Sequence, residues 1–315
     1  MTKLSPSRVD LPLHGKLWNA IGLFRYHVGL RRMRPYAVTA LDDIDAYRAL
    51  LETYSGLALE RARVLEIGYG ARPWRLLALL STGADALGVD AEVPVLEGHA
   101  WEYREALRRN GVERALKSFV RHTVFDRRDW GAFRAELRRR GLRERIDRSR
   151  FLVGDAADLA LPPGSLDLVI SEEVFEHVRR ESLSRLVPKL ARWLRPEGLA
   201  LIRPNVFTGI TGGHHPEWYR HTFQLHRRRR LTEPWEHLRR DRMRPDTYLN
   251  RLTRAQYRAL LETSFEILEE MVALPDLGRE LLTPSVAAEL AAYPDEELFS
   301  NQVLFVMRPR GRARE

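Results

Sequence analysis

The sequence predicts an α/β protein whose parallel sheet is covered by helices on both faces. The first observation is a strand, a glycine turn and a helix in succession. Residues 64–67 are mainly apolar, Gly68 and Gly70 allow a tight turn, and Pro73 opens the helical pattern of residues 73–80. The second is the return of short apolar runs between helical patterns, at residues 85–89, 151–153, 166–170 and 199–203. Such a unit holds a nucleotide-like ligand at the carboxyl end of its strand.

The composition excludes several classes of protein. Of the 315 residues, 44% are hydrophobic, which is enough for a full core, and none is cysteine. The chain therefore has no disulfide, no thiol nucleophile and no cysteine-based zinc site, and we expect a cytoplasmic location. No uncharged apolar run reaches the roughly 18 residues of a membrane-spanning helix, and we expect no signal peptide.

The charge pattern leaves two questions open. The net charge is +9, and nearly all of the excess is arginine. This charge allows a nucleic-acid partner, above all through the arginine-rich residues 227–244, but acids interspersed along the chain favour a compositional bias. Residues 17–33 form a basic amphipathic helical pattern, which can lie on a membrane surface. We favour packing of this helix on its own domain.

The predicted organisation has two parts. Residues 1–60 form an N-terminal helical cap whose second helix covers residues 42–54, and residues 61–315 form the α/β domain. A helical insertion follows the second strand at about residues 97–149, with helices at 101–109, 112–122 and 130–140. Because it leaves the sheet at the carboxyl end, we expect a cap over an acceptor site. An oligomer interface and a solvated decoration remain alternatives.

Four stretches in the right order resemble the class I S-adenosylmethionine-dependent methyltransferases. They are Glu66-Ile-Gly68-Tyr-Gly70, Phe151-Leu-Val-Gly-Asp155-Ala156, Ser165 to Glu172 with Glu176-His177-Val178, and Leu194-Arg-Pro196-Glu197-Gly198 with its following strand. The resemblance spans residues 63–203 and two closing strands. It implies a Rossmann-like sheet of seven strands with the last one antiparallel, and S-adenosylmethionine as the cofactor. Glu197 stands where the family commonly has a second glycine.

The resemblance also implies which residues hold the cofactor. Gly68, Tyr69 and Gly70 would line its methionine part, Asp90 its ribose, and Asp155 with Ala156 its adenine. Acids at the end of the fourth strand would complement its positive charge or cap a helix. The complete expected set is Glu66, Gly68, Tyr69, Gly70, Asp90, Ala91, Asp155, Ala156, Ser171 and Glu172.

The loop region at about residues 204–252 carries the candidates for chemistry. A neutral histidine there can take the proton of an acceptor hydroxyl, and we rank His215 and His214 before His221. Acceptor contacts are expected from Asn205, Trp218, Tyr219 and Arg220. We expect no metal site, because no nearby pair of aspartates completes one, so metal-assisted O-methylation is the lesser alternative.

The resemblance implies methyl transfer. The long loop with Pro204-Asn205, Gly212 to His215 and Trp218 is similar to those of methyltransferases that modify saccharides or secondary metabolites, so we expect a small-molecule or glycan acceptor and transfer to a hydroxyl oxygen. One rival is an RNA or tRNA methyltransferase that uses the arginine-rich surface. Residues 171–174 lack the Asn-Pro-Pro-Tyr type of motif that resembles the enzymes methylating base amines. The other rival is a methyltransferase-like binding protein without turnover.

Overall fold

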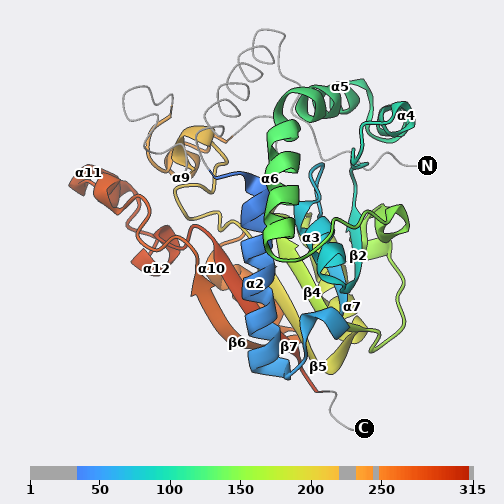
Figure 1. Ribbon diagram of the computed structural model, residues 1–315. Coiled ribbons are helices and arrows are strands. Elements are labelled where there is room, and N and C mark those ends of the chain that lie inside the picture. The colour runs from blue at the N-terminus through green and yellow to red at the C-terminus, as the bar shows by residue number, and fades with distance from the viewer. Residues whose placement is uncertain (1–33, 220–231, 244–247, 312–315) are drawn as a thin grey trace.

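Seven strands form a single sheet in the order β3-β2-β1-β4-β5-β7-β6 (Figure 1). The computed structural model describes residues 34–219, 232–243 and 248–311. Strands β1 to β5 run parallel, and β7 is antiparallel to both of its neighbours, which confirms the predicted fold class. The strands are β1 (Arg63–Ile67), β2 (Asp85–Asp90), β3 (Phe151–Val153), β4 (Leu166–Glu172), β5 (Leu194–Arg203), β6 (Phe265–Val272) and β7 (Val303–Pro309).

The helices of the described residues include those predicted from residue 42 on, with shifted ends. They are α2 (Tyr36–Ser55), α3 (Trp74–Thr82), α4 (Ala100–Asn110), α5 (Val112–Val120), α6 (Asp126–Arg139), α7 (Arg180–Trp193), α9 (Glu236–Arg239), α10 (Arg254–Glu262), α11 (Pro284–Glu289) and α12 (Asp295–Leu298). Helix α2 begins earlier than expected, directly after Pro35. The predicted helix at residues 17–33 lies outside the described residues. No helix in the described part of the chain has the length and apolar character needed to cross a bilayer.

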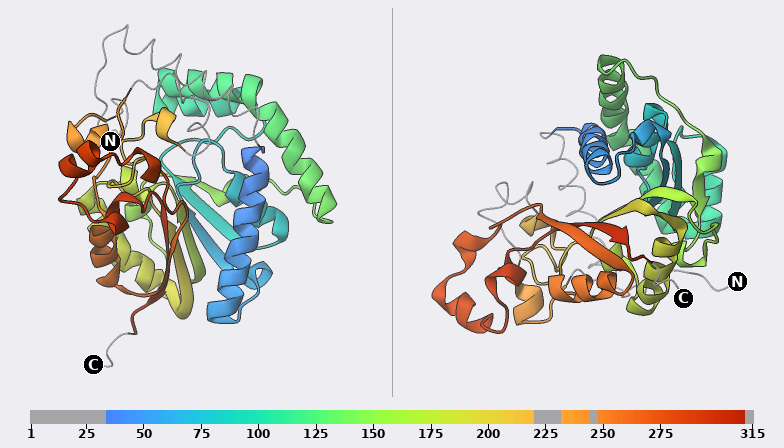
Figure 2. Two further views of the ribbon diagram at one scale, coloured as in Figure 1. Left: turned by 90° about the vertical axis from the view of Figure 1, so that its left-hand side faces the viewer. Right: turned by 90° about the horizontal axis from the view of Figure 1, so that it is seen from below.

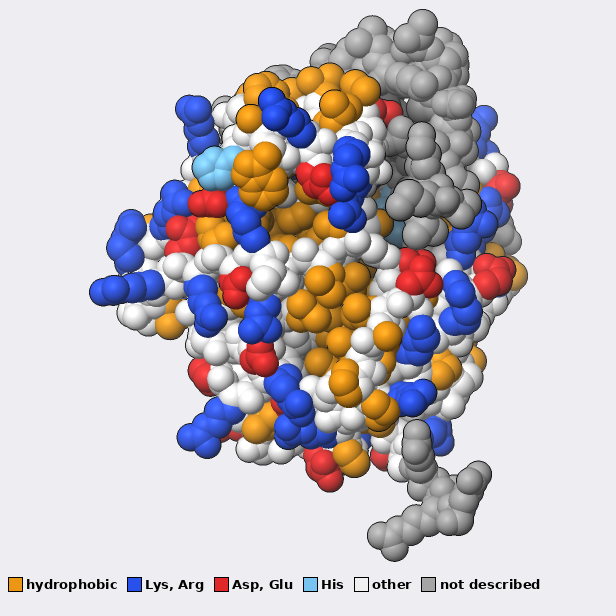
Figure 3. Space-filling model, turned by 90° about the vertical axis from the view of Figure 1, so that its right-hand side faces the viewer, with side chains coloured by type: hydrophobic (Ala, Val, Ile, Leu, Met, Phe, Trp, Pro, Cys, Tyr) orange, Lys and Arg blue, Asp and Glu red, His pale blue; other side chains and the backbone are white. Residues whose placement is uncertain are grey.

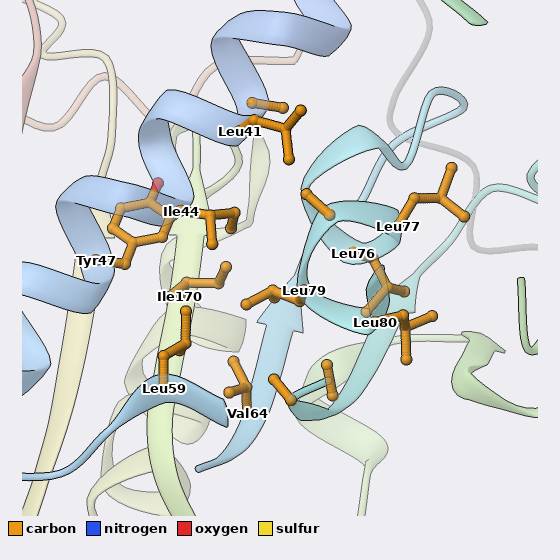
Figure 4. Close-up of a cluster of buried hydrophobic side chains, with 14 of the residues drawn as sticks. Leu41, Ile44, Tyr47, Leu59, Val64, Leu76, Leu77, Leu79, Leu80 and Ile170 are labelled. Atoms are coloured by element: carbon orange, nitrogen blue, oxygen red, sulfur yellow. The ribbon is translucent and has the colours of Figure 1, made fainter. Parts of the chain in front are cut away.

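The two faces of the sheet are buried by different helices (Figure 2). Successive residues of a strand point to opposite faces. In β4, Leu168 and Ile170 join a core formed with α2, α3 and α6. Val169, between them, joins the core formed with α7 and α10. Figure 4 shows the first of these cores, where side chains of α2 and α3 meet those of β1 and β4. Helix α2 is thus packed within the same core as the sheet.

The insertion after β2 has one face in the core and another in solvent. Helix α6 buries Trp130, Phe133 and Leu137, and the rings of Phe133 and Trp74 lie 5.5 Å apart. Helix α5 instead exposes apolar side chains, among them Val112, Leu116 and Phe119. Charged side chains of both signs are mixed over the surface seen in Figure 3. The helices of the insertion are confirmed, while its role as a cap stays a prediction.

Phe133→Ala should destabilise the protein far more than Phe119→Ala. Phe133 is fully buried, whereas Phe119 is 49% exposed. Removing a buried phenylalanine ring costs about 3–5 kcal/mol, and changes at exposed positions usually cost below about 1 kcal/mol. Urea denaturation of both variants measures the free energy of unfolding. Equal losses would contradict the packing of α6 on α3.

Candidate active site

The glycine turn after β1 requires both of its glycines. Gly68 has φ of +79°, and a Cβ atom there would lie 2.1 Å from a methyl group of Val174. Gly70 has φ of +68°, and its N–H donates to Oδ2 of Asp90 at 2.8 Å. L-residues with side chains are strained at such angles. The turn therefore lies against the segment after β4 on one side and the end of β2 on the other.

Asp90 lies at the carboxyl end of β2, where the sequence predicted a ribose contact. Its carboxylate accepts from the N–H of Gly70 and, at 2.7 Å, from the N–H of Glu92. Burial raises the pKa of Asp90 to about 6. The side chain of Asn110 donates to the carbonyl of Ala91 at 2.9 Å and so fixes the next turn. Each carboxylate oxygen of Asp90 keeps a lone pair for a further donor.

Glu66 is a buried acid at this edge whose carboxyl group is incompletely compensated. Its residue is 3% exposed, and its Oε2 has no hydrogen-bond partner among the described residues. Burial raises the pKa of Glu66 to about 8, against the opposing effect of Arg75. The side chain is therefore largely neutral at pH 7. A cation placed beside it would favour its ionised form.

Tyr69 contributes to the turn through its backbone only. Its ring packs edge-on against Phe151, and its hydroxyl donates to the carbonyl of Leu152 at 2.9 Å. The predicted cofactor contact is therefore corrected for the ring, which is buried below β2 and β3. Gly88 leaves room for this ring, because a Cβ at residue 88 would lie 2.7 Å from it.

Asp155 and Ala156 follow β3, next to the end of β2. The N–H of Gly154 donates to the carbonyl of Asp90 at 2.8 Å, which joins the two strand ends. The Asp155 carboxylate accepts from the N–H of Ala157 at 2.8 Å and caps a 3₁₀ turn. The predicted ribose and adenine contacts thus come from adjacent segments. Asp155 also has the turn-capping role that an aspartate takes at such a position.

Ser171 and Glu172 belong to β4, which extends two residues beyond the strand predicted at residues 166–170. Their side chains bind other parts of the protein. Ser171 Oγ donates to the carbonyl of Ile67 at 3.0 Å. Glu172 accepts from the hydroxyl of Tyr47 and from Arg203.

Arg203 continues the network of Glu172 towards α2. It also pairs with Asp43 at 3.2 Å, and Asp43 pairs with Arg75 at 2.9 Å. Two carboxylates thus face two guanidinium groups in a region that is largely shielded from water. Both carboxylate oxygens of Glu172 accept hydrogen bonds within this network, so its predicted cofactor contact is not supported by the geometry.

A second group of polar side chains lies where β4 and β5 end. Glu176 and His177 form a single 3₁₀ turn after β4, and His214 comes from the loop after β5. Oε1 of Glu176 lies 3.9 Å from Nε2 of His177 and 4.0 Å from Nε2 of His214. Burial raises the pKa of Glu176 to about 7.

In the sequence, Glu176 and His177 are part of the family resemblance, and His177 is a possible base for which a structural role is preferred, but neither is among the predicted site residues. The usable pattern was a Glu-His pair after one strand and a histidine after the neighbouring strand. Parallel neighbours end at the same edge of a sheet, so these side chains converge. Asn205, predicted to contact the acceptor, instead donates its side-chain N–H to Oε1 of Glu176 at 2.6 Å.

The loop after β5 is supported by a small apolar cluster. Trp218 is 1% exposed and packs with Ile210 and Trp235, while its indole N–H donates to Thr232 at 2.8 Å. Its ring therefore supports the loop, which corrects the predicted acceptor contact. Tyr219 lies edge-on to His214, with ring centroids 6.1 Å apart.

The other predicted loop residues are not part of this group. The ring of His215 lies against the backbone of the next segment, with Nε2 3.2 Å from the carbonyl of Arg242. Arg220 and His221 lie outside the described residues. Of the three histidines ranked as bases, His214 alone is shown beside a carboxylate among the residues that the structure covers.

His237 braces this loop from the side. Its Nε2 lies 2.8 Å from the carbonyl of Phe207, so this nitrogen carries the proton. A Cβ at Gly213 would lie 2.8 Å from the Cβ of His237, so the glycine allows this close approach. Burial lowers the pKa of His237 to about 4. The side chain is neutral at physiological pH and serves as a structural donor.

Residues 115–202 match a family model described as a methyltransferase domain. No curated protein matches the sequence. The match begins in α5 and ends in β5, so it does not include the glycine turn.

Several solved structures share low similarity with the chain. An S-adenosylmethionine-dependent methyltransferase from Mesorhizobium loti has 16% identity and a TM-score of 0.42, over 85% of this chain and 99% of that one. Geranyl diphosphate C-methyltransferase from Streptomyces coelicolor A3(2), solved with Mg²⁺, geranyl diphosphate and S-adenosyl-L-homocysteine, has 15% identity and a TM-score of 0.41, over 84% of this chain and 77% of that one. Likeness at this level supports no conclusion about the ligands of this chain.

His237→Gln should change how stability depends on pH. The unfolded chain binds a proton at this side chain near pH 6.5, and the folded protein only near pH 4. The stabilisation is therefore complete above about pH 6.5 and is lost as the pH falls towards 4, by up to about 3 kcal/mol. Glutamine keeps a donor but does not titrate. Denaturant unfolding between pH 4 and 7 should show a smaller loss in the variant, and parallel curves would contradict the assignment.

Proposed function

Because the chain belongs to the class I S-adenosylmethionine-dependent methyltransferases, we propose that it methylates a hydroxyl oxygen of a small molecule or a glycan. The observation that carries this proposal is the arrangement of two groups of side chains along one edge of the sheet. The ends of β1, β2 and β3 offer a cofactor site. The ends of β4 and β5 offer a separate group of titratable side chains.

The first group fits S-adenosylmethionine. Asp90 keeps lone pairs for the ribose hydroxyls, and the half-buried Asp155 and Ala156 lie on the next strand end for the adenine. The buried Glu66, whose Oε2 has no hydrogen-bond partner among the described residues, suits the positive charge of the methionine part. When bound, the cofactor supplies an activated methyl group. The protein positions the cofactor and the acceptor and excludes water.

The second group suits deprotonation of an acceptor. In the proposed reaction the hydroxyl oxygen bonds to the methyl carbon while the carbon–sulfur bond breaks. The electron pair of that bond stays on sulfur, and the hydroxyl proton leaves to a base. His214 is the loop histidine with a carboxylate beside it, since Glu176 lies 4.0 Å away. We therefore place His214 before His215 as the base that takes the proton of the acceptor hydroxyl.

The described arginines favour a small acceptor over RNA. Arg239 pairs with Glu289, Arg242 lies 2.9 Å from Glu236, and Arg251 lies 2.8 Å from Asp241. Ion-paired arginines are poorer contacts for a phosphate backbone, because their partners must be displaced. The run at residues 227–230 lies outside the described residues. RNA affinity that falls steeply with salt would support the rival function.

Asp90→Ala should lose affinity for S-adenosylmethionine, while Asp85→Ala should not. Both residues lie on β2, but Asp85 is at the opposite end and pairs with Arg150 on the surface. Hydrogen bonds to a charged group contribute about 1.5–3 kcal/mol, so we expect a loss of roughly 10- to 100-fold. Isothermal titration calorimetry measures the dissociation constants. A wild-type protein without cofactor affinity, with and without candidate acceptors, would support the binding-protein rival instead.

His214→Asn should reduce methyl transfer without changing cofactor affinity. Asparagine tolerates the positive φ of +55° at this position but is a poor base. Loss of a general base typically costs about 10²- to 10⁴-fold in rate. The measurement is transfer of labelled methyl from S-adenosylmethionine to a panel of sugars, polyols and hydroxy acids. A large loss in His215→Asn with none in His214→Asn would assign the proton to the other histidine.

A further inference from the structure

We propose that Glu176, His177 and His214 bind a divalent transition-metal ion, and that this ion holds the acceptor oxygen. The role of the ion rests on the proposed function, but its binding does not. The sequence predicted no metal site because it lacks a pair of aspartates in this region. The structure instead brings together two imidazoles and one carboxylate from two neighbouring strand ends.

The spacing of the donor atoms suits one ion. One ligand atom from each of the three residues can be chosen so that all lie within 4.8 Å of one another. Ions of this class bind nitrogen and oxygen at about 2.0–2.2 Å, so their ligand atoms lie roughly 3–4 Å apart. The two distances from Oε1 of Glu176, 3.9 Å and 4.0 Å, need only a small contraction.

The hydrogen bond of His177 determines which of its two ring nitrogens can bind a metal ion. Its Nδ1 lies 3.0 Å from the carbonyl of Tyr248, and a carbonyl can only accept, so Nδ1 carries the proton. The lone pair is then on Nε2, the nitrogen nearer to Glu176. Metal-binding histidines commonly donate their other N–H to a carbonyl in this way, which fixes the ring and the tautomer.

Glu176 is buried, oriented and incompletely bonded. The residue is 3% exposed, and Asn205 donates to its Oε1 at 2.6 Å. Its Oε2 has no hydrogen-bond partner among the described residues. The backbone of Glu176 is held as well, since its carbonyl accepts from the N–H of Asn250 at 2.9 Å. A buried carboxylate oxygen without a donor is costly, and a cation would compensate for it.

His214 is held in an unusual backbone conformation. It has φ of +55°, and its N–H donates to the carbonyl of Thr211 at 2.9 Å. Its ring lies edge-on to that of His177, with centroids 4.8 Å apart. Side chains with strained backbones persist where the surroundings fix them, often at ligand sites. The strain here brings the ring of His214 to the other two groups.

The set of donors indicates the class of metal. Two imidazoles and one carboxylate suit Zn²⁺, Fe²⁺, Co²⁺ or Ni²⁺, whereas Mg²⁺ and Ca²⁺ prefer oxygen ligands. Three protein ligands leave positions open for a substrate oxygen. A hydroxyl bound there would lose its proton to solvent more readily. In the metal-bound protein His214 would act as a ligand in place of the base proposed above, and the alkoxide oxygen would attack the methyl group as the carbon–sulfur bond breaks.

The test measures metal binding to the full chain without cofactor or acceptor. Chelator-treated protein is titrated with Zn²⁺ by calorimetry, with Mg²⁺ as the contrasting ion, and with Co²⁺ while its visible absorption reports the ligands. We expect one Zn²⁺ per chain and weaker binding of Mg²⁺. Glu176→Gln, His177→Gln and His214→Asn should each lose at least about 100-fold in Zn²⁺ affinity, because changes to residues that only orient a ligand already cost about 10- to 100-fold.

Two control variants separate this site from adventitious binding. His99→Ala removes a surface histidine that lies 3.7 Å from Glu97, and His215→Ala removes the histidine adjacent to His214. Both should bind Zn²⁺ as the wild type does. Circular dichroism and S-adenosylmethionine affinity check that the three ligand variants remain folded. Wild-type affinity in folded ligand variants, or loss in the controls alone, would overturn the proposal.

The outcomes distinguish the two proposals. Site-specific Zn²⁺ binding without affinity for S-adenosylmethionine would support the metal site and overturn the proposed function. Cofactor binding and acceptor methylation by chelator-treated protein that takes up no Zn²⁺ when titrated would support the function and overturn the metal site.

Discussion

The structure depends on how four carboxyl groups, three buried and one half-buried, are compensated at one edge of the sheet. A buried carboxylate is stable only when hydrogen bonds, cations or protonation compensate for lost hydration. Asp90 is compensated by backbone N–H groups and Glu172 by Arg203 and Tyr47. Glu176 accepts a hydrogen bond from Asn205 at one oxygen only, and burial raises the pKa of Glu66 to about 8. The two incompletely compensated acids are the ones for which a positively charged ligand is argued.

The compensation of Glu172 explains why α2 is integral to the domain. Asp43 and Tyr47 are both on α2, and through Arg203 they fix the ends of β4 and β5. The segments that carry Glu176 and His214 leave the sheet from those two ends. Removing one partner from such a buried network costs about 3–5 kcal/mol, because a charge stays behind without compensation. The helix before the first strand thereby supports the position of the acceptor side.

Local patterns in the sequence predicted the strands, the sheet and the strand-ending acids. Gly68, Gly70 and Asp90 are within one strand–turn–helix–strand unit, so spacing alone brings them together. The partners of Glu172 could not be predicted, because Tyr47 is 125 residues away in sequence. Nor does a sequence show whether an aromatic side chain is buried, as Trp218 is. The contact between the rings of His177 and His214 depends on two things. The strand order could be predicted from the sequence, but the positive φ of His214 could not.

Val174 connects the cofactor turn with the proposed acceptor side. Its side chain fills the space that a Cβ at Gly68 would need, and it lies two residues before Glu176. The cofactor residues lie at β1, β2 and β3, and the acceptor-side residues at β4 and β5, so this contact is at the boundary between the two groups. Methyl transfer is an in-line displacement, and a misplacement of about 1 Å can cost roughly 100-fold in rate. The close packing of Gly68 on Val174 therefore fixes the relative position of the two groups. Residue 68 must be glycine for this packing, because a Cβ would collide with Val174 and because the backbone has a positive φ.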